Sequence, residues 1–369
     1  MTWDTDAVDY VKDRGVASAR GEAPLQNWEY RELAQAIKGA GLLDEQIGYY
    51  THKVLSIWAM LALGVALLPA ARDHGLYLLD AAYLAFVSGQ IGFLGHDAAH
   101  RQIFRQHWKS TVFCIVHGNL LLGLSYGWWT HFHTTHHRNP NCADLDGDLE
   151  IAGLAFTEEQ ARKRGGLLRL VAKYQAYTFF PFLALTALGL RVNSVQALLF
   201  ANVRYRFAEA FFLGAHGVLY GWFVFSLLGA RRGALFVVLH QVLFGLYLGS
   251  TFAPNHKGML MWGSHAPLDS LRKQILTARN VTPGRITDFW YGGLNYQIEH
   301  HLFPSMPRNR LREARKIVTL FCRAHAISYT ERGVMQSYRD ILRSLHNVSK
   351  AFHTFGHQHP DATPPGIRR

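Results

Sequence analysis

The sequence has few cysteines and few charged side chains. Its three cysteines, Cys114, Cys142 and Cys322, are far apart and include no CxxC pair. This scattered, odd-numbered set supports neither a disulfide framework nor a thiolate metal site, and it favours a reducing compartment. Charged residues make up 17% of the chain, against about a quarter in soluble globular proteins. The net charge of +12 comes without a recognisable nucleic-acid-binding module, so nucleic acid is not expected as a partner.

The N-terminal segment also lacks the basic, apolar and small-residue regions of a secretory signal, so we expect the N-terminus to stay in the cytosol. Hydrophobic residues nevertheless make up 49% of the chain, while the mean hydropathy is only −0.01. These values predict long apolar segments diluted by a comparable mass of polar chain.

Four stretches without Lys, Arg or Glu are long enough to cross a membrane: 54–71, 75–95, 210–230 and 233–254. They predict an all-α integral membrane protein with two helical hairpins. The short turns carry Arg72, Arg231 and Arg232, and the other Lys and Arg residues lie on the opposite side. This distribution predicts a multi-pass protein of the cell inner membrane with both termini and the functional face in the cytosol. Asp80 lies within the second stretch and is expected to face other helices or an interface.

Two further apolar stretches, 111–129 and 174–190, complicate this topology. Pro181 makes the second a poor straight helix. A crossing of about 19 residues at 1.5 Å per residue would separate its ends by roughly 28 Å. Histidines on either side of such a crossing could not share a site, so both stretches are interpreted as interfacial or re-entrant helices.

Histidine is unusually frequent, with 21 copies, and it forms three clusters. The clusters are H-D-A-A-H at 96–100, H-T-T-H-H at 133–137 and Q-I-E-H-H at 297–301. Residues spaced i, i+3 and i+4 share one face of a helix, so each cluster can aim its imidazoles at a common point. The first and third clusters also follow predicted spans, which allows all three to meet at one membrane face.

The histidines are expected to bind metal. Neutral imidazole suits iron, zinc, copper and nickel, and seven histidines exceed the needs of one tetrahedral zinc. The sequence therefore predicts a two-metal centre, held by a cytosolic helical cap, with core histidines as the alternative. Asp97 and Glu299 are candidates for orienting imidazoles, or else ordinary solvated carboxylates. Gln297 stands where a histidine would complete the third triplet, and it can ligate weakly or hold a water.

These residues resemble the membrane-bound fatty acid desaturases, which carry three histidine boxes on a four-span scaffold. The resemblance covers about 55–315 and includes H-H-R-N-P-N at 136–141 and G-G-L-N-Y-Q-I-E-H-H-L-F-P at 292–304. Glutamine at the start of the third box is similar to the front-end subgroup, of the delta-6 or linoleoyl-CoA type. The roughly 50 residues before the first span contain no haem-binding H-P-G-G string, so the resemblance is to bacterial members without a fused haem domain.

The resemblance implies a reaction and a ligand set. Two irons and O2 would introduce a cis double bond into a fatty acyl chain carried by CoA, carrier protein or phospholipid. Electrons would come from an external ferredoxin or flavoprotein reductase. The implied iron ligands are His96, His100, His133, His136, His137, His300 and His301, with His256 as a further ligand and Asn255 beside it as the less favoured choice.

This interpretation divides the chain into four parts. They are a cytosolic segment over 1–53, the membrane and catalytic domain over 54–315, cytosolic helices over 316–350 and a loose tail over 351–369. Three kinds of rival remain open: a related di-iron hydroxylase, acetylenase or conjugase, a membrane zinc hydrolase, and a transporter or metal-handling protein.

Aromatic and charged residues near the boxes receive secondary interpretations. Aromatic side chains there can wall an acyl slot or anchor the membrane interface; they are Trp128, Trp129, Trp290, Tyr291 and Tyr296. A basic run can face a carrier's phosphates, lipid headgroups or an acidic ferredoxin, or form a solvated helix face; it comprises Arg308, Arg310, Arg312, Arg315 and Lys316. The carboxylates of Asp144, Asp146 and Asp148 do not form an EF-hand, because Leu149 and Ala155 replace its glycine and glutamate.

Overall fold

The computed structural model describes residues 27–73, 75–151, 153–265 and 268–354. These residues are mostly helical, and their strands are the two-residue pair β1 (Asn280–Val281) and β2 (Glu331–Arg332). The all-α prediction is therefore confirmed for this part of the chain. The first half of the predicted N-terminal segment and the predicted tail beyond 354 lie outside the described residues.

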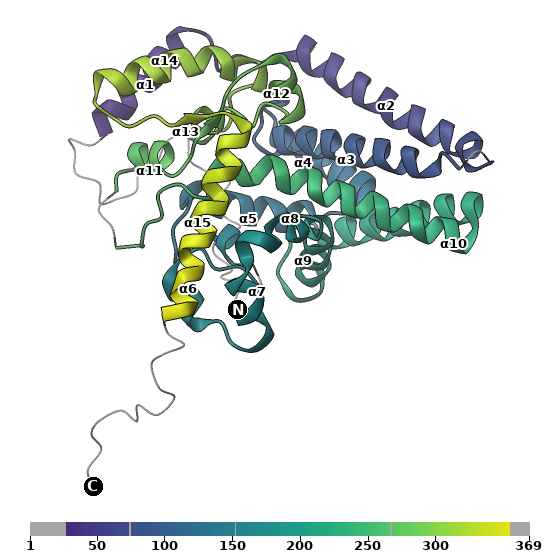
Figure 1. Ribbon diagram of the computed structural model, residues 1–369. Coiled ribbons are helices and arrows are strands. Elements are labelled where there is room, and N and C mark those ends of the chain that lie inside the picture. Colours follow the sequence, from purple (N-terminus) through teal and green to yellow (C-terminus); the bar gives the residue numbers. More distant parts are fainter. Residues whose placement is uncertain (1–26, 74, 152, 266–267, 355–369) are drawn as a thin grey trace.

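Among the described residues, three helices are long and apolar enough to cross a membrane, and two bent helix pairs would raise the number to five if each made one span. The three helices are α2 (Ile47–Asp73), α3 (Tyr77–Ala99) and α10 (Arg206–His256), and they run side by side away from the remaining helices (Figure 1). α3 lies centrally and packs against both α2 and α10. Close approach uses small residues, since a Cβ on Gly64 would lie 2.5 Å from Leu84 of α3.

α10 is folded back on itself at Gly229, where φ is 70° and ψ is 179°. The Tyr220 hydroxyl lies 2.9 Å from His240 Nδ1, whereas twenty residues of straight helix would separate them by about 30 Å. Val224, Leu228 and Phe236 therefore share one buried cluster with Leu68 and Leu84. The fold at Gly229 agrees with the predicted break between 210–230 and 233–254.

The two ambiguous apolar stretches are both sharply bent. The first forms α4 (His107–Cys114) and a π-helical segment (Ile115–Leu122), followed after a 109° bend by α5 (Tyr126–Arg138). The second forms α8 (Gln175–Leu183) and α9 (Thr186–Phe200), which meet at 68°. Neither stretch is one straight helix, in line with the interfacial or re-entrant interpretation.

The remaining helices form a cap at one end of the long helices (Figure 1). They are α1 (Asn27–Gly39), α6 (Glu158–Lys163), α7 (Gly166–Lys173), α11 (Ser270–Leu276), α12 (Arg285–Trp290), α13 (Gln297–Leu302), α14 (Leu311–Ala324) and α15 (Val334–Thr354), with 3-10 turns at Gly147–Leu149 and Arg308–Arg310. Leu33 of α1, Ile298 of α13 and Val318 of α14 belong to one buried core. This core holds the third histidine cluster against the ends of the long helices.

Candidate metal centre

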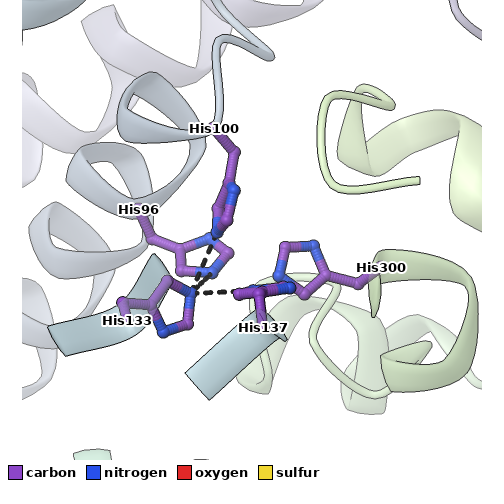
Figure 2. Close-up of side chains that lie close together, drawn as sticks. All are labelled: His96, His100, His133, His137 and His300. Carbon is purple, nitrogen blue, oxygen red and sulfur yellow. Dashed lines mark hydrogen bonds between the residues drawn. The ribbon is translucent and has the colours of Figure 1, made fainter. Parts of the chain in front are cut away.

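Five histidines form a first group, drawn in Figure 2. His96 and His100 come from the end of α3, His133 and His137 from α5, and His300 from α13. His133 Nε2 lies 3.2 Å from His96 Nε2, 2.9 Å from His100 Nε2 and 3.1 Å from His137 Nε2. Each of the five offers a nitrogen within 4.8 Å of the others. The group thus joins all three sequence clusters.

His136, His256 and His301 form a second group beside the first. His256 Nε2 lies 3.3 Å from His136 Nε2 and 3.0 Å from His301 Nε2. His256 is the last residue of α10, so the hairpin brings to the site a histidine that belongs to none of the three boxes. The structure therefore gathers all eight candidate ligand histidines into two adjacent groups.

Hydrogen bonds at Nδ1 determine which ring nitrogen of each histidine in the second group is free to bind a metal. His136 Nδ1 lies 3.0 Å from both carboxylate oxygens of Asp146, and His256 Nδ1 lies 3.1 Å from the Thr277 carbonyl oxygen. His301 Nδ1 lies 2.9 Å from Gln274 Oε1. Oxygen atoms of these kinds only accept, so each Nδ1 carries the proton and each Nε2 presents a lone pair. Three lone pairs directed at one point fit a metal cation.

Burial favours the neutral form of most imidazoles at the site. At His136 burial also lowers the pKa, but the carboxylates of Asp148 and Asp146 outweigh it and raise that pKa. Desolvation and neighbouring imidazoles lower the pKa values of His300 and His301 well below the usual range. Burial would raise the pKa of Asp146, but the hydrogen bond and charge of His136, with the charge of Lys257, lower it to about 2. Neutral imidazole is the metal-binding form, and an ionised Asp146 strengthens the basicity of His136.

Several buried nitrogens of the first group have no hydrogen-bond partner among the described residues. They include both ring nitrogens of His300 and the Nδ1 atoms of His96 and His137. A buried polar atom without a partner costs about 1–3 kcal/mol. Coordination would satisfy His300, and the donor set of imidazoles in two groups suits iron or zinc. The residues present therefore fit a pair of transition-metal ions.

The helix carrying the second cluster is held at its first turn by buried polar groups. Ser125 caps α5 by accepting from Trp128 N at 3.2 Å. The Glu209 carboxylate accepts from Gly127 N at 3.1 Å and from Ser125 Oγ at 2.7 Å. A carboxylate is stabilised at a helix N-terminus by the unpaired N–H groups and the helix dipole. Glu209 lies at the start of α10, so it ties α5 to the hairpin that delivers His256.

The four other candidate site residues have distinct places. The Gln297 amide lies 2.9 Å from His256 Nε2 and accepts from Asn255 Nδ2 at 3.0 Å, so both flank the second group. Asp97 pairs with the buried Arg308, and its other oxygen lies 3.6 Å from His96 Nδ1.

Glu299 accepts from Asn280 at 2.7 Å and from Tyr329 at 2.8 Å, and burial raises its pKa to about 7. It anchors α13 on the side of β1 and Tyr329.

Sequence reasoning missed Asp146, Gln274, Thr277 and Glu209 as supports of the site. Asp146 was weighed only as a calcium ligand, yet it lies ten residues beyond His136 and is buried against it. Its exclusion from an EF-hand still holds, but an acidic run shortly after a histidine box was the available signal for a ligand-orienting carboxylate. The other three contacts are long range and leave no local pattern.

The five aromatic residues near the boxes do not form one wall. Trp129 stacks on His133 with centroids 4.5 Å apart. Trp128 stacks on Phe132, and Tyr296 lies in the cap core with its hydroxyl on Asp288. Tyr291 is buried. Trp290 lines an apolar cleft of about 360 Å³ between α3, α8 and α10, with Ala82, Phe86, Leu183 and Leu246 among its neighbours.

The arginines of the basic run after the third cluster have several different partners. Arg308 is buried against Asp97, Arg312 pairs with Asp288 of α12, and Arg315 pairs with Glu331 of β2. Arg310 reaches Glu313 at 3.7 Å. Carboxylates from other elements neutralise most of the run, because the cap folds α12 and β2 against α14.

Known proteins are similar in sequence to this chain over most of its length. The family described as "Fatty acid desaturase" matches residues 74–333. The acyl-lipid (9-3)-desaturase of Physcomitrium patens is 29% identical over 341 residues, which is 88% of this chain and 63% of that protein. The delta-6 fatty acid desaturase of Caenorhabditis elegans is 29% identical over 361 residues, covering 94% and 80%.

Human fatty acid desaturase 3 is 29% identical over 322 residues, covering 86% and 72%. The match thus covers less than two thirds of the Physcomitrium patens protein and more than two thirds of the other two proteins. The family match over residues 74–333 includes all eight histidines of the two groups. The chain belongs to the fatty acid desaturase family, a family of oxidoreductases.

Proposed function

We propose that this protein is a di-iron desaturase that introduces a cis double bond into a fatty acyl chain. The carrying observation is the convergence of eight histidines into two adjacent buried groups. Two irons bound there would supply the oxidising power, derived from O2, that removes hydrogen from unactivated C–H bonds. Side-chain acids, bases or nucleophiles cannot remove these hydrogens, because methylene C–H bonds are not acidic.

The electron balance requires an external donor. Forming one double bond removes two hydrogen atoms from the acyl chain, which amounts to two protons and two electrons. Reducing one O2 to two waters takes four electrons, so two more electrons and two protons must be supplied. We propose that a separate redox protein, such as a ferredoxin or a flavoprotein reductase, delivers these electrons.

The protein's own residues hold and shield the reaction. Asp146, Thr277 and Gln274 fix the proton on Nδ1 of three histidines and so direct Nε2 inward. All eight histidines lie in a buried or half-buried setting, which keeps water away from the reacting carbons. The apolar cleft beside Trp290 is the proposed seat for part of the acyl chain, because its lining matches a hydrocarbon.

The finer parts of this proposal concern position and topology. Gln297 at the start of the third cluster and the delta-6, delta-5 and delta-8 names among the relatives support front-end desaturation of an acyl-CoA or acyl-lipid. We propose four crossings, made by α2, α3 and the two halves of α10, in a cell inner membrane. The cap and both termini would then lie in the cytosol, where the redox partner is available.

Metal analysis and product analysis together test the proposal. The full-length protein, purified in detergent after expression in iron-replete medium, should hold about two irons per chain. Reduced with dithionite and a mediator and given O2 and acyl substrate, it should yield an alkene rather than an alcohol or alkyne. A hydroxylated or acetylenic product would identify a related di-iron reaction, and zinc alone with hydrolytic activity would refute the redox function.

A further inference from the structure

A cationic cavity of about 330 Å³ lies on the cap, away from the apolar cleft. Its lining includes three arginines and a single carboxylate: Arg315 of α14, Arg323 of α14, Arg332 of β2 and Glu331 of β2. Glu331 is occupied by Arg315, with contacts of 2.6 and 2.9 Å. Arg323 and Arg332 are exposed, and Arg332 Nε lies 3.9 Å from the Asp340 carboxylate. Three arginines thus face the two carboxylates of Glu331 and Asp340, and the cavity keeps a net positive charge.

Tyr329 connects this cavity to the metal site. Its ring lines the cavity, and its hydroxyl donates to Glu299 Oε1 at 2.8 Å. Asn280 Nδ2 reaches Glu299 Oε2 at 2.7 Å and Tyr329 Oη at 2.6 Å. Glu299 is bonded directly to His300, a member of the first histidine group. Tyr329 at the cavity is therefore linked to His300, a candidate metal ligand, through the Glu299 side chain and the peptide bond that follows it.

The same region is stiffened by the strand pair. Asn280 of β1 pairs with Glu331 of β2, and Asn280 Oδ1 accepts from Ile298 N of α13 at 3.0 Å. The cavity rim, β1 and α13 thus share a continuous hydrogen-bonded framework. A partner bound at the rim would lie over a rigid, short connection to the site.

We propose that this cavity is the docking site of an acidic electron-donor protein. The inference rests on the proposed function, which requires two external electrons for each double bond. Electron-transfer partners form small, weak interfaces, and opposite charge raises the rate at which they meet. The donor would be oxidised in two one-electron steps and the bound metal pair would be reduced, with Tyr329 and Glu299 lying between the cavity and the histidines.

The experiment measures donor binding and donor-driven turnover separately. Full-length protein in detergent is titrated with an acidic plant-type ferredoxin at low and high salt. The variants are Arg323→Glu, Arg332→Glu and their combination, with Arg343→Glu on the exposed side of α15 as the matched charge reversal. We expect about tenfold weaker ferredoxin binding in the double variant and a smaller salt dependence, with wild-type behaviour for Arg343→Glu.

Dithionite-driven turnover separates failure of docking from failure of the proposed function. The double variant should form product normally when dithionite and a mediator replace ferredoxin, because its metal site is untouched. Tyr329→Phe should bind ferredoxin normally and accept electrons from it more slowly.

Unchanged ferredoxin affinity in the double variant, or no measurable affinity in the wild type, would overturn the docking proposal. A raised KM for acyl-CoA with unchanged ferredoxin affinity would instead assign the cavity to the carrier's phosphates. Absence of product with dithionite in the wild type would refute the desaturase function itself.

Discussion

His137 stacks on His301 with ring centroids 4.2 Å apart and an angle of 19° between their planes. His137 belongs to the first histidine group and His301 to the second, so this pair lies where the two groups meet. One residue comes from α5 and the other from α13, more than 160 positions later. The contact makes the two groups parts of one site, and each prediction below follows from that arrangement or from its surroundings.

Replacing His136 with alanine should remove one metal ion and abolish product formation. His136 supplies a nitrogen to the second group and is the hydrogen-bond partner of the buried Asp146. Its loss opens the group and leaves a buried carboxylate without its partner. We expect about one iron per chain instead of two, measured by elemental analysis, and product below about 1% of wild type.

His131→Ala is the matched control for that substitution. His131 is exposed on the same helix and lies outside both groups. It should keep both irons and wild-type product formation. A fully active His136→Ala protein would refute the assignment of the second group.

Asp146→Asn should weaken metal binding without removing a ligand. The asparagine keeps the shape of the side chain but loses the charge that polarises His136 through its Nδ1 proton. Changes of this kind cost about 10–100-fold in metal affinity. A chelator competition assay on the purified protein measures the change. Asp144→Asn, which alters an exposed carboxylate bonded to Ser264, should have no such effect, and equal losses in both variants would contradict the orienting role of Asp146.

Asp97→Asn should destabilise the fold by breaking a buried ion pair. Asp97 and Arg308 are both nearly inaccessible to solvent and bond to each other. Removing one partner of such a pair costs about 3–5 kcal/mol, because the other charge stays buried. Thermal unfolding in detergent should show a lower midpoint for Asp97→Asn, with partial recovery when Arg308→Met is added.

The more accessible pair of Arg310 and Glu313, with side chains 35% and 56% exposed, provides the comparison. Arg310→Met should change stability by less than about 1 kcal/mol, as is usual for surface ion pairs. If Asp97→Asn is no more harmful than Arg310→Met, the buried pair does not hold the end of α3 to the segment after the third cluster.

Ala82→Phe should shift the substrate preference toward shorter acyl chains. Ala82 is half-buried and lines the apolar cleft beside Trp290, so a phenyl ring there reduces the space available to a hydrocarbon. Competition between acyl substrates of two lengths, followed by product analysis, gives the ratio of kcat/KM values. Leu79→Phe, at a position 69% exposed on the same helix, should leave that ratio unchanged. An unchanged ratio in Ala82→Phe would place the acyl chain elsewhere.

Much of the site could be predicted because its information is local. Spacings of three and four residues bring His96 with His100, and His133 with His136 and His137, onto shared helix faces before any tertiary contact forms. The apolar stretches likewise indicate where long helices lie, since only uncharged segments of that length suit a membrane. Even the fold at Gly229 has a local cause, because a positive φ is readily adopted by glycine.

Other features depended on contacts between residues far apart in the sequence. The sequence left the basic run open between a partner surface and a solvated helix face, and only the structure places Asp288, Glu331 and Asp97 against it. Glu209 and Asp146 looked like ordinary acidic residues, yet each is buried and binds the helix that carries the second cluster. Their partners lie on other elements, so no sequence period indicates them.

The sequence by itself determined which residues can ligate metal and which segments are apolar, because both depend on residue type and short-range spacing. Tertiary structure decided how these ligands divide into two groups, with His300 and His301 separated although they are adjacent in the chain. It also decided which carboxylates orient imidazoles and which neutralise arginines. The physical reason is that the pairing of buried charges and lone pairs depends on distance and desolvation, which are set by the packing of α3, α5, α10 and α13 together.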